Sequence, residues 1–337
     1  MSQAFLTTLC IFTLSLNLVA IVSMWARTHQ LDVPNARSSH TTPTPRGGGI
    51  AIVLASLAGA LVLWWNGQLA DGLALAIVCG GAGIALVGHI DDRRNIATLP
   101  RLVIHIAAAA FALWCIGGVA ALPVGTYIWH PGSIGWLIAL VGLVWMINLT
   151  NFMDGIDGLV GSHTIFVSLA GAALLWATAT PGGAAFMVLL AAATAGFLVF
   201  NWPPASIFMG DVSSGFLGFV IGAVAIATAE HVNLWAWGLL LTPFIADATI
   251  TRAMRIVRYG DWVGAHRSHV YQRLSRRWSG HAPVVHTYWL ISLIVFWPLA
   301  LLVTLHPAVG WVVMPAAWGI SFAAAFALGA GRNDEAA

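Results

Sequence analysis

One short segment of the sequence places an oxygen-bearing side chain at every third residue. The segment reads NLTNFMDGIDGL over residues 148–159, and these side chains belong to Asn148, Asn151, Asp154 and Asp157. Residues three apart on a helix lie side by side, and the two glycines of the DGIDG stretch indicate that the helix ends there. The pattern predicts an oxygen-rich pocket at the end of an apolar helix, and it disfavours a purely structural role for the four residues.

Two further acidic sites adjoin apolar stretches. Asp91 and Asp92 are adjacent in HIDDRRN, and adjacent carboxylates at a membrane boundary are costly unless a cation or an arginine neutralises them. A divalent metal site and a solvated loop with Asp–Arg pairing are both consistent with this motif. Asp211 follows Gly210 in FMGD, where we expect it either to cap a helix or to ligate a metal.

Basic residues gather in two other motifs. Arg46 stands in PTPRGGG, whose three glycines allow a backbone to approach a phosphate closely, although a simple connector is the alternative. In AHRSHVYQRL, a helix would place His266, His269 and Arg273 on one face. That face is typical of an anion-binding site because guanidinium groups repel metal cations. A basic helix bound to lipid headgroups is the alternative.

The acids and the basic residues together indicate phosphoryl transfer. Such chemistry needs a divalent cation and positive side chains that neutralise phosphate charge, and it needs little covalent participation from the protein. Hard oxygen ligands favour Mg²⁺, with Mn²⁺ as the alternative, over Zn²⁺. A nucleic acid partner is not expected.

The elements that must position these motifs are membrane-spanning helices. Of the 337 residues, 59% are hydrophobic and 8% are charged, whereas soluble domains have roughly 25% charged residues. Charge-free runs near or beyond the roughly 20 residues that span a bilayer recur along the chain. We therefore expect a single all-α, polytopic membrane domain over residues 1–337. It would have about eleven transmembrane helices, at 4–24, 47–65, 72–90, 102–120, 134–150, 159–178, 184–200, 212–229, 234–252, 284–304 and 309–329.

The arginines predict the orientation of this bundle. The chain has 14 basic residues, all of them arginine, and positive charge is retained on the cytoplasmic side of short loops. We expect the N-terminus outside and the C-terminus in the cytoplasm. The cytoplasmic loops would lie at about 25–46, 91–101, 151–158, 201–211 and 253–283, so that the site faces the cytoplasm. Residues 1–25 carry no charge, which favours a transmembrane helix there over a signal peptide.

These motifs resemble those of the polyprenyl-phosphate N-acetylhexosamine-1-phosphate transferases. The matching stretches are PTPRGGG, HIDDRRN, NLTNFMDGIDGL, FMGD and AHRSHVYQRL, in the family's order, between residues 43 and 274. The resemblance implies an enzyme of ten or eleven helices in the inner membrane of a bacterium. It implies transfer of a sugar 1-phosphate from a UDP-sugar to polyprenyl phosphate, with release of UMP and a requirement for Mg²⁺. Its partners would be these two substrates and membrane lipid, and a homodimer is left open.

The resemblance also assigns roles to residues. It implies that Asp211 ligates the metal and that Asn151 and Asp154 shape the metal and nucleotide pocket. The Asp91–Asp92 pair would lie at the acceptor phosphate, and the last motif would hold the diphosphate or the sugar. The expected catalytic residues are therefore Asp91, Asp92, Asp154, His266 and His269. The expected substrate-binding residues are Arg46, Asn148, Asn151, Asp157, Arg267 and Arg273, and the expected metal ligands are Asn151, Asp154 and Asp211.

One departure from the family narrows the expected product. The peptidoglycan branch has a run of histidines in the last motif, whereas this chain has two separated ones, His266 and His269. The difference favours an undecaprenyl-phosphate transferase that starts O-antigen, a part of lipopolysaccharide, or a related envelope polysaccharide. A multi-span transporter or lipid-carrier flippase is the rival class, but transporters place polar residues near the membrane midplane and show repeated halves. Here only Asp247 is expected within the membrane, and no repeat is evident.

Overall fold

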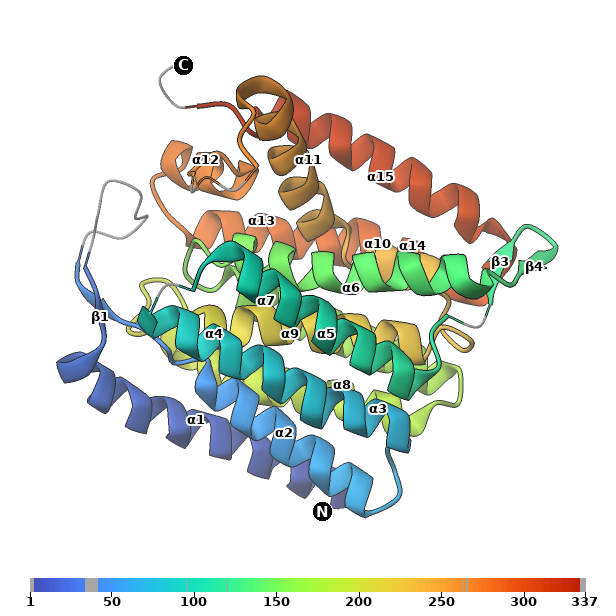
Figure 1. Ribbon diagram of the computed structural model, residues 1–337, viewed down its shortest axis with the longest axis horizontal. Coiled ribbons are helices and arrows are strands. Elements are labelled where there is room, and N and C mark those ends of the chain that lie inside the picture. Colours follow the sequence, from blue (N-terminus) through green and yellow to red (C-terminus); the bar gives the residue numbers. More distant parts are fainter. Residues whose placement is uncertain are drawn as a thin grey trace.

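The helices of the computed structural model lie side by side, most of them running across the view of Figure 1. The structure describes residues 3–33, 42–94, 96–119, 121–262, 264 and 266–333. Within these residues the regular elements are helices, apart from two small antiparallel hairpins. The all-α class expected from the sequence is confirmed.

The elements follow one another along the chain with short connections. The helices of the first half are α1 (Gln3–His29), α2 (Ile50–Trp65), α3 (Asp71–Leu75), a π-helical turn (Ala76–Gly81), α4 (Ala82–Arg94), α5 (Thr98–Ile116) and α6 (Gly132–Met153). Those of the second half are α7 (Leu159–Ala177), α8 (Pro181–Asn201), α9 (Asp211–Ala227), α10 (Leu234–Leu240), α11 (Thr242–Tyr259), α12 (Val270–Arg277), α13 (Ala282–Ile291), a π-helical turn (Ser292–Phe296), α14 (Trp297–Leu305), a 3₁₀ turn (Pro307–Val309) and α15 (Gly310–Ala327). The hairpins pair β1 (Leu31–Asp32) with β2 (Thr44–Pro45) and β3 (Leu122–Val124) with β4 (Tyr127–Trp129).

Many of these helices are long and apolar enough to cross a membrane. Among the described residues there are 8 such stretches, and α10 with α11 makes a ninth that is bent by 76°. The helices α2 and α9 are apolar but shorter. A multi-pass membrane protein therefore agrees with the structure, while the count of eleven spans and the orientation of the termini stay predictions.

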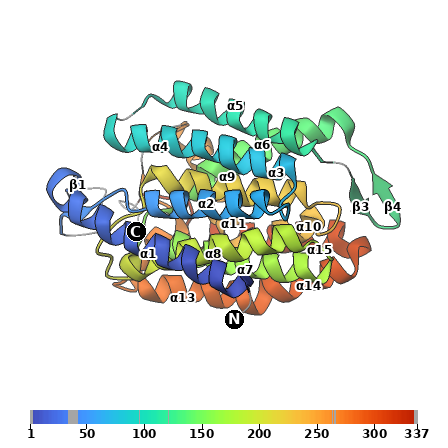
Figure 2. The ribbon, with the colours of Figure 1, turned by 90° about the horizontal axis from the view of Figure 1, so that it is seen from below.

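Helix α9 lies in the interior of the bundle. Figure 2 shows it in the middle, with α5 on one side and α13 on the other. Nearly all of its residues are buried, as expected for a helix that is apolar on every face. Two glycines let its neighbours approach closely: a Cβ atom at Gly88 of α4 would overlap the carbonyl oxygen of Asp211, and one at Gly218 would overlap that of Met146 in α6. Helix α9 therefore packs closely on α4 at its first residue and on α6 two turns further along.

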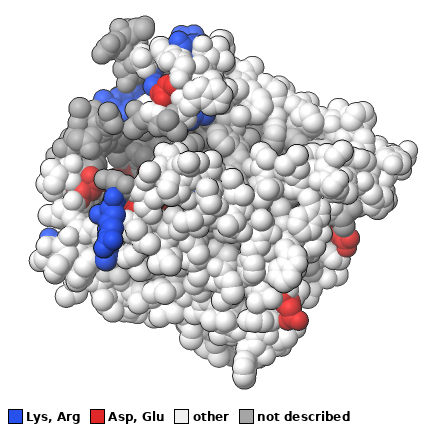
Figure 3. Space-filling view, in the orientation of Figure 1, with Lys and Arg blue, Asp and Glu red and all other residues white. Residues whose placement is uncertain are grey.

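The two ends of the bundle differ in charge. In Figure 3 the arginine side chains lie at the left and upper left of the face shown, around the loops that carry the polar motifs. The β3–β4 hairpin lies at the opposite end in Figure 1. The positive-inside rule then predicts that the arginine-rich end is cytoplasmic.

Cysteine labelling tests this orientation. In a protein without its native cysteines, a membrane-impermeant maleimide should label Thr126→Cys, in the β3–β4 turn, on intact cells. Thr98→Cys, at the start of α5, should react only after permeabilisation. Both threonines are exposed, whereas Ser275 is buried and Ser39 lies outside the described residues. Labelling in the reverse order would contradict the predicted orientation.

Candidate active site

Asp92 caps the first turn of α9. Its carboxylate accepts hydrogen bonds from the backbone N–H groups of Asp211 at 3.0 Å and Val212 at 3.1 Å, and its side chain is 1% exposed. A carboxylate at a helix N-terminus satisfies free N–H groups and interacts favourably with the helix dipole. The sequence left Asp211 either to cap this helix or to ligate a metal, and the structure gives the capping role to Asp92. The carboxylate of Asp211 is therefore not needed for capping.

Asp91 points to different partners. It forms an ion pair with Arg101, and it accepts a hydrogen bond from the backbone N–H of Ile96 at 2.6 Å. The same guanidinium of Arg101 lies 3.9 Å from Oδ2 of Asp211. The Asp–Arg pairing considered from the sequence is thus present. Both members of the acidic pair hold the surroundings of Asp211 in place.

The PTPRGGG motif packs directly against FMGD. The N–H groups of Gly47 and Gly48 donate to the carbonyl of Phe208 at 3.1 and 2.9 Å, and that of Gly49 donates to Met209 at 3.0 Å. A Cβ atom at Gly49 would overlap the side chain of Ser213. Because the N–H groups of these glycines already have backbone partners, the structure agrees with the connector that the sequence left open beside a phosphate contact. The glycines bring Arg46 close to the start of α9.

Arg46 neutralises two carboxylates at once. Its Nη2 lies 3.0 Å from Oδ1 of Asp211 and 3.0 Å from Oδ1 of Asp92. Burial lowers the pKa of the Arg46 guanidinium, but the charges of Asp211 and Asp92 outweigh burial, so its pKa is raised above the usual value. The guanidinium therefore stays positive at the edge of the pocket.

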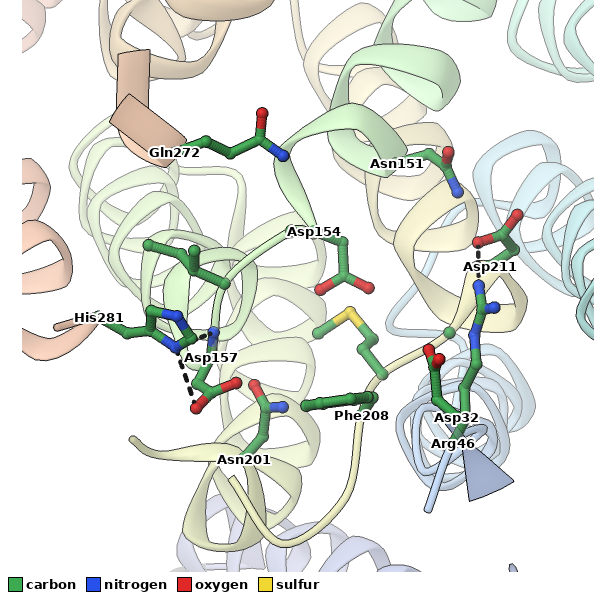
Figure 4. A pocket seen from close by; sticks show the side chains of 14 residues that line it. Asp32, Arg46, Asn151, Asp154, Asp157, Asn201, Phe208, Asp211, Gln272 and His281 are labelled. Carbon is green, nitrogen blue, oxygen red and sulfur yellow. Dashed lines mark hydrogen bonds and ion pairs between the residues drawn. The ribbon is translucent and has the colours of Figure 1, made fainter. Parts of the chain in front are cut away.

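Asp154 projects into the pocket between these groups and the opposite wall. Figure 4 shows its carboxylate in the middle of the view, with Arg46 and Asp211 on one side. It directly follows α6, and no hydrogen bond or ion pair reaches its carboxylate from the described residues. Burial raises the pKa of Asp154 well above the ordinary value, and the charge of Arg46 opposes the rise. A buried carboxylate without a donor is costly, so Asp154 is suited to bind a cation.

The pocket around Asp154 has a volume of about 210 Å³. The sequence-predicted residues that line it are Arg46, Asn151, Asp154, Asp157 and Asp211. The amide of Asn151 donates to Ser214 Oγ at 3.1 Å, which leaves its oxygen available as an acceptor. No group of three or more His, Cys, Asp or Glu side chains suitable for a metal occurs in the described part of the chain. Asp154 and Asp211 supply two carboxylates, which is the number that Mg²⁺ commonly takes from a protein when phosphates and water complete its coordination.

Other lining residues were not predicted from the sequence. They are Asp32, Asn201, Phe208, Gln272 and His281. Asn201 fixes the wall, since its Oδ1 accepts from the N–H of Gly158 at 3.0 Å and its Nδ2 donates to the carbonyl of Ile207 at 2.9 Å. Phe208 stands in FMGD and Gln272 in AHRSHVYQRL, which is a usable signal, whereas Asp32 and Asn201 lie outside the motifs. His281, in the stretch SGHAP, has none.

The last motif is arranged differently from the prediction. Helix α12 begins at Val270, so His266 and His269 precede it and share no helix face with Arg273. His269 Nδ1 lies 3.2 Å from Oδ1 of Asp247, whose carboxylate also accepts the N–H groups of Val270 and Tyr271, each at 2.9 Å. Asp247, the acid expected within the membrane, therefore anchors the start of α12.

The remaining members of the predicted set do not line this pocket. The rings of His266 and His269 stack 5.1 Å apart, and burial lowers the pKa of His266 to about 3, so it is neutral. Arg273 donates to the carbonyl of Arg332 at 3.4 Å, and the carbonyl of Arg267 accepts from Arg276 at 3.0 Å. Asn148 donates to Val144 of its own helix at 2.7 Å. The substrate roles expected of these residues stay predictions.

Comparison with known proteins places the chain in a family. Residues 74–229 match the model of glycosyl transferase family 4. A phospho-N-acetylmuramoyl-pentapeptide-transferase of Shouchella clausii is 30% identical over 268 residues, which are 74% of this chain and 81% of that relative. The chain belongs to glycosyl transferase family 4. The family match includes all the acids around the pocket except Asp32, and it does not include Arg46 or His281.

Two further relatives act on N-acetylglucosamine according to their names. A probable undecaprenyl-phosphate N-acetylglucosaminyl 1-phosphate transferase of Bacillus subtilis is 27% identical over 285 residues, 78% of this chain and 75% of the relative. A decaprenyl-phosphate N-acetylglucosaminephosphotransferase of Mycolicibacterium smegmatis is 31% identical over 235 residues, 63% of this chain and 58% of the relative. With its apolar helices, this family member is a multi-pass membrane transferase.

Proposed function

We propose that the protein transfers a sugar 1-phosphate, of N-acetylhexosamine type, from a UDP-sugar to undecaprenyl phosphate, giving a polyprenyl-diphosphate sugar and UMP. The observation that carries the proposal is the carboxylate of Asp154, which lies in the pocket beside the Arg46–Asp211 ion pair and has no hydrogen-bond donor among the described residues. The names of the relatives give the class of reaction. A site at one end of the helices lets a water-soluble nucleotide meet an acceptor whose tail stays in lipid.

Mg²⁺ fits the donor set, with Mn²⁺ as the alternative. Asp154 and Asp211 would hold it, with the side-chain oxygen of Asn151. When bound, the cation would neutralise charge that builds up on the diphosphate. Two hard carboxylates and an amide oxygen favour these cations over Zn²⁺.

The proposed reaction is a direct displacement at phosphorus. An oxygen of the polyprenyl phosphate attacks the sugar-proximal phosphorus of the donor, the bond from that phosphorus to the bridging oxygen breaks, and UMP leaves with the bridging oxygen. The second pKa of a phosphate monoester is about 6, so the acceptor is mostly dianionic at neutral pH and needs no strong base. Asp91 and Asp92 already accept backbone hydrogen bonds and form ion pairs with arginines, so we propose that they position the groups around Asp211. Arg46 offsets the repulsion between the two anionic substrates.

An apolar cavity offers space for part of the acceptor's tail. It has a volume of about 480 Å³ and lies between α6, α9, α10, α11 and α15, and Leu122 and Trp129 of the β3–β4 hairpin also line it. Its wall is almost wholly apolar. Trp145 of α6 lines it, and this residue lies within two helical turns of Asn151, which lines the polar pocket. A hydrocarbon chain is therefore the ligand that suits this cavity. We propose that it holds part of the polyprenyl chain.

Filling the cavity tests this assignment. Gly142 lines it, and a Cβ atom there would meet nothing within 4 Å. Gly142→Leu should raise the KM for undecaprenyl phosphate about tenfold and leave the KM for the UDP-sugar unchanged. Gly83→Leu is the matched control, because Gly83 also has open space around its Cβ position but does not line the cavity. Equal acceptor KM values for the two variants would contradict the assignment.

A donor panel tests the proposed substrate class. Purified protein should form lipid-linked product from at least one UDP-N-acetylhexosamine and not from UDP-N-acetylmuramoyl-pentapeptide, as the two separated histidines of the last motif suggest. We propose that the product starts O-antigen or a related envelope polysaccharide at the cytoplasmic face of a bacterial inner membrane. Product only from the muramoyl-pentapeptide donor would reverse this assignment. Transport of the lipid carrier without any chemical product would favour the flippase.

A further inference from the structure

His281 forms one wall of the pocket together with Asp157. It immediately precedes α13, and Figure 4 shows its ring against the Asp157 side chain, across the pocket from Arg46 and Asp211. Its Nδ1 accepts a hydrogen bond from the backbone N–H of Asp157 at 3.3 Å, and it lies 3.1 Å from Oδ2 of the same residue. The two side chains are 16% and 12% exposed. The contact is therefore largely buried. Asp157 was a predicted site residue, whereas His281 was not.

Nδ1 has two partners on Asp157, a backbone donor and a carboxylate acceptor. A single imidazole nitrogen either donates or accepts, and an unprotonated Nδ1 would face the lone pairs of the Asp157 carboxylate. A protonated Nδ1 donates to Oδ2, and an unprotonated Nδ1 accepts the backbone N–H of Asp157, so either form of the ring binds this residue. The histidine therefore holds Asp157 through Nδ1.

Asp157 connects His281 to the turn that carries Asp154. Oδ2 of Asp157 also accepts a hydrogen bond from the backbone N–H of Ala205 at 3.1 Å. The carboxylate thus joins three segments of the chain: the turn after α6, the loop before α9 and the loop before α13. Asp154 stands three residues earlier in the same turn and has no hydrogen bond of its own from the described residues. The orientation of the Asp154 side chain therefore depends on how firmly that turn is held.

We propose that His281 is a positioning residue of the transfer reaction, which holds the Asp157 carboxylate, and with it the 154–158 turn, in the orientation that receives the nucleotide of the donor. This inference rests on the proposed function, because the donor is the ligand of the pocket. The histidine acts through Nδ1, so its Nε2 is dispensable. Reactions that depend on aligned groups lose about 100-fold when a group is misplaced by about 1 Å, so loss of the contact should be measurable.

A pair of amide variants separates positioning from mere space filling. The side-chain nitrogen of asparagine can occupy the place of Nδ1, whereas that of glutamine reaches the place of Nε2. We expect His281→Asn to keep kcat/KM for the UDP-sugar within about fivefold of the wild type. His281→Gln and His281→Ala should lose about 10- to 100-fold. By calorimetry, the Kd for UMP should weaken about tenfold in these two variants and stay near the wild-type value in His281→Asn.

Two controls complete the test. His286 is an exposed histidine that does not line the pocket, and its ring centroid lies 5.6 Å from that of Trp202. His286→Ala should leave kcat/KM and the Kd for UMP unchanged. In a double-mutant cycle, Asp157→Asn and His281→Ala together should cost less than the product of the two single losses. Equal values for the asparagine and glutamine variants, an unaffected His281→Ala, or fully multiplicative losses would each overturn the inference while leaving the proposed function intact. Inactive wild-type protein would overturn both.

Discussion

Asp211→Ala should abolish turnover without unfolding the protein. The carboxylate of Asp211 pairs with Arg46 at the pocket, while the N–H groups of the first turn of α9 bind Asp92 instead. The variant therefore loses a proposed cation ligand but no helix cap. We expect kcat to fall by three powers of ten or more, since one well-placed electrostatic group is worth about 10²–10³ in kcat and the cation it holds contributes further. Added Mg²⁺ should not restore the rate.

A matched acid serves as the control for Asp211. Asp71 is the first residue of α3, as Asp211 is of α9, and its carboxylate accepts a hydrogen bond from the indole of Trp64 at 2.8 Å. Figure 1 shows α3 toward the same end of the bundle as the β3–β4 hairpin, and Asp71 does not line the pocket. Asp71→Ala should retain activity. Turnover by Asp211→Ala within tenfold of the Asp71→Ala value would remove Asp211 from the site.

Asp154→Asn should lose activity without losing stability. The carboxylate of Asp154 is desolvated and receives no hydrogen bond from the described residues, so it lowers the free energy of unfolding of the metal-free protein. Asparagine has nearly the same shape and no charge. We expect kcat/KM to fall about 100-fold or more, and the melting temperature in a chelator to stay equal or rise by about 2–4 °C.

Asp92→Asn, in contrast, should destabilise the protein. That substitution weakens the cap of α9 and the ion pair with Arg46, so its melting temperature should fall below that of the wild type. Comparing the two variants separates an acid kept for function from one that holds the fold. A melting temperature for Asp154→Asn clearly below the wild-type value would show that its carboxylate stabilises the protein, contrary to our interpretation.

Much of the pocket could be predicted from short stretches of sequence. The three-residue spacing of Asn151, Asp154 and Asp157 was a local signal, and all three line the pocket. Asp211 and Arg46 were marked by glycines beside a charge, and they form an ion pair. The all-α class followed from composition, because few charges and long apolar runs allow a chain little else than membrane helices. These signals lie within a few residues of the features that they predict.

Contacts between distant segments could not be predicted in this way. Asp92 caps a helix that starts 119 residues later, and Asp247 caps α12 from the adjoining long helix. The second contact explains why the last motif was misplaced. The N–H groups of Val270 and Tyr271 bind the Asp247 carboxylate, so the helix starts there, after both histidines. Neither capping aspartate is close in the sequence to the helix that it caps, so no local sequence pattern indicates the contact.

Similar reasons apply to residues whose chemistry was recognised but whose partners were not. The glycines of PTPRGGG could bind either a phosphate or another backbone, and only the fold shows that Phe208 and Met209 supply the carbonyl groups. His281 looked like any polar residue in a loop, because the carboxylate that gives it a role lies 124 residues earlier. The sequence identifies groups able to act, and the packing decides which of them meet.

Analysis of the nucleotide product tests the central claim most directly. Purified protein in detergent, given a UDP-N-acetylhexosamine with phosphorus-32 in the sugar-proximal phosphate, undecaprenyl phosphate and Mg²⁺, should release unlabelled UMP. The label should pass into the lipid in equal amount. That result requires cleavage between the two phosphorus atoms, as the proposed displacement does. Labelled UDP in the aqueous phase would show transfer of the sugar alone, and the absence of any released nucleotide with every UDP-sugar would contradict the transferase.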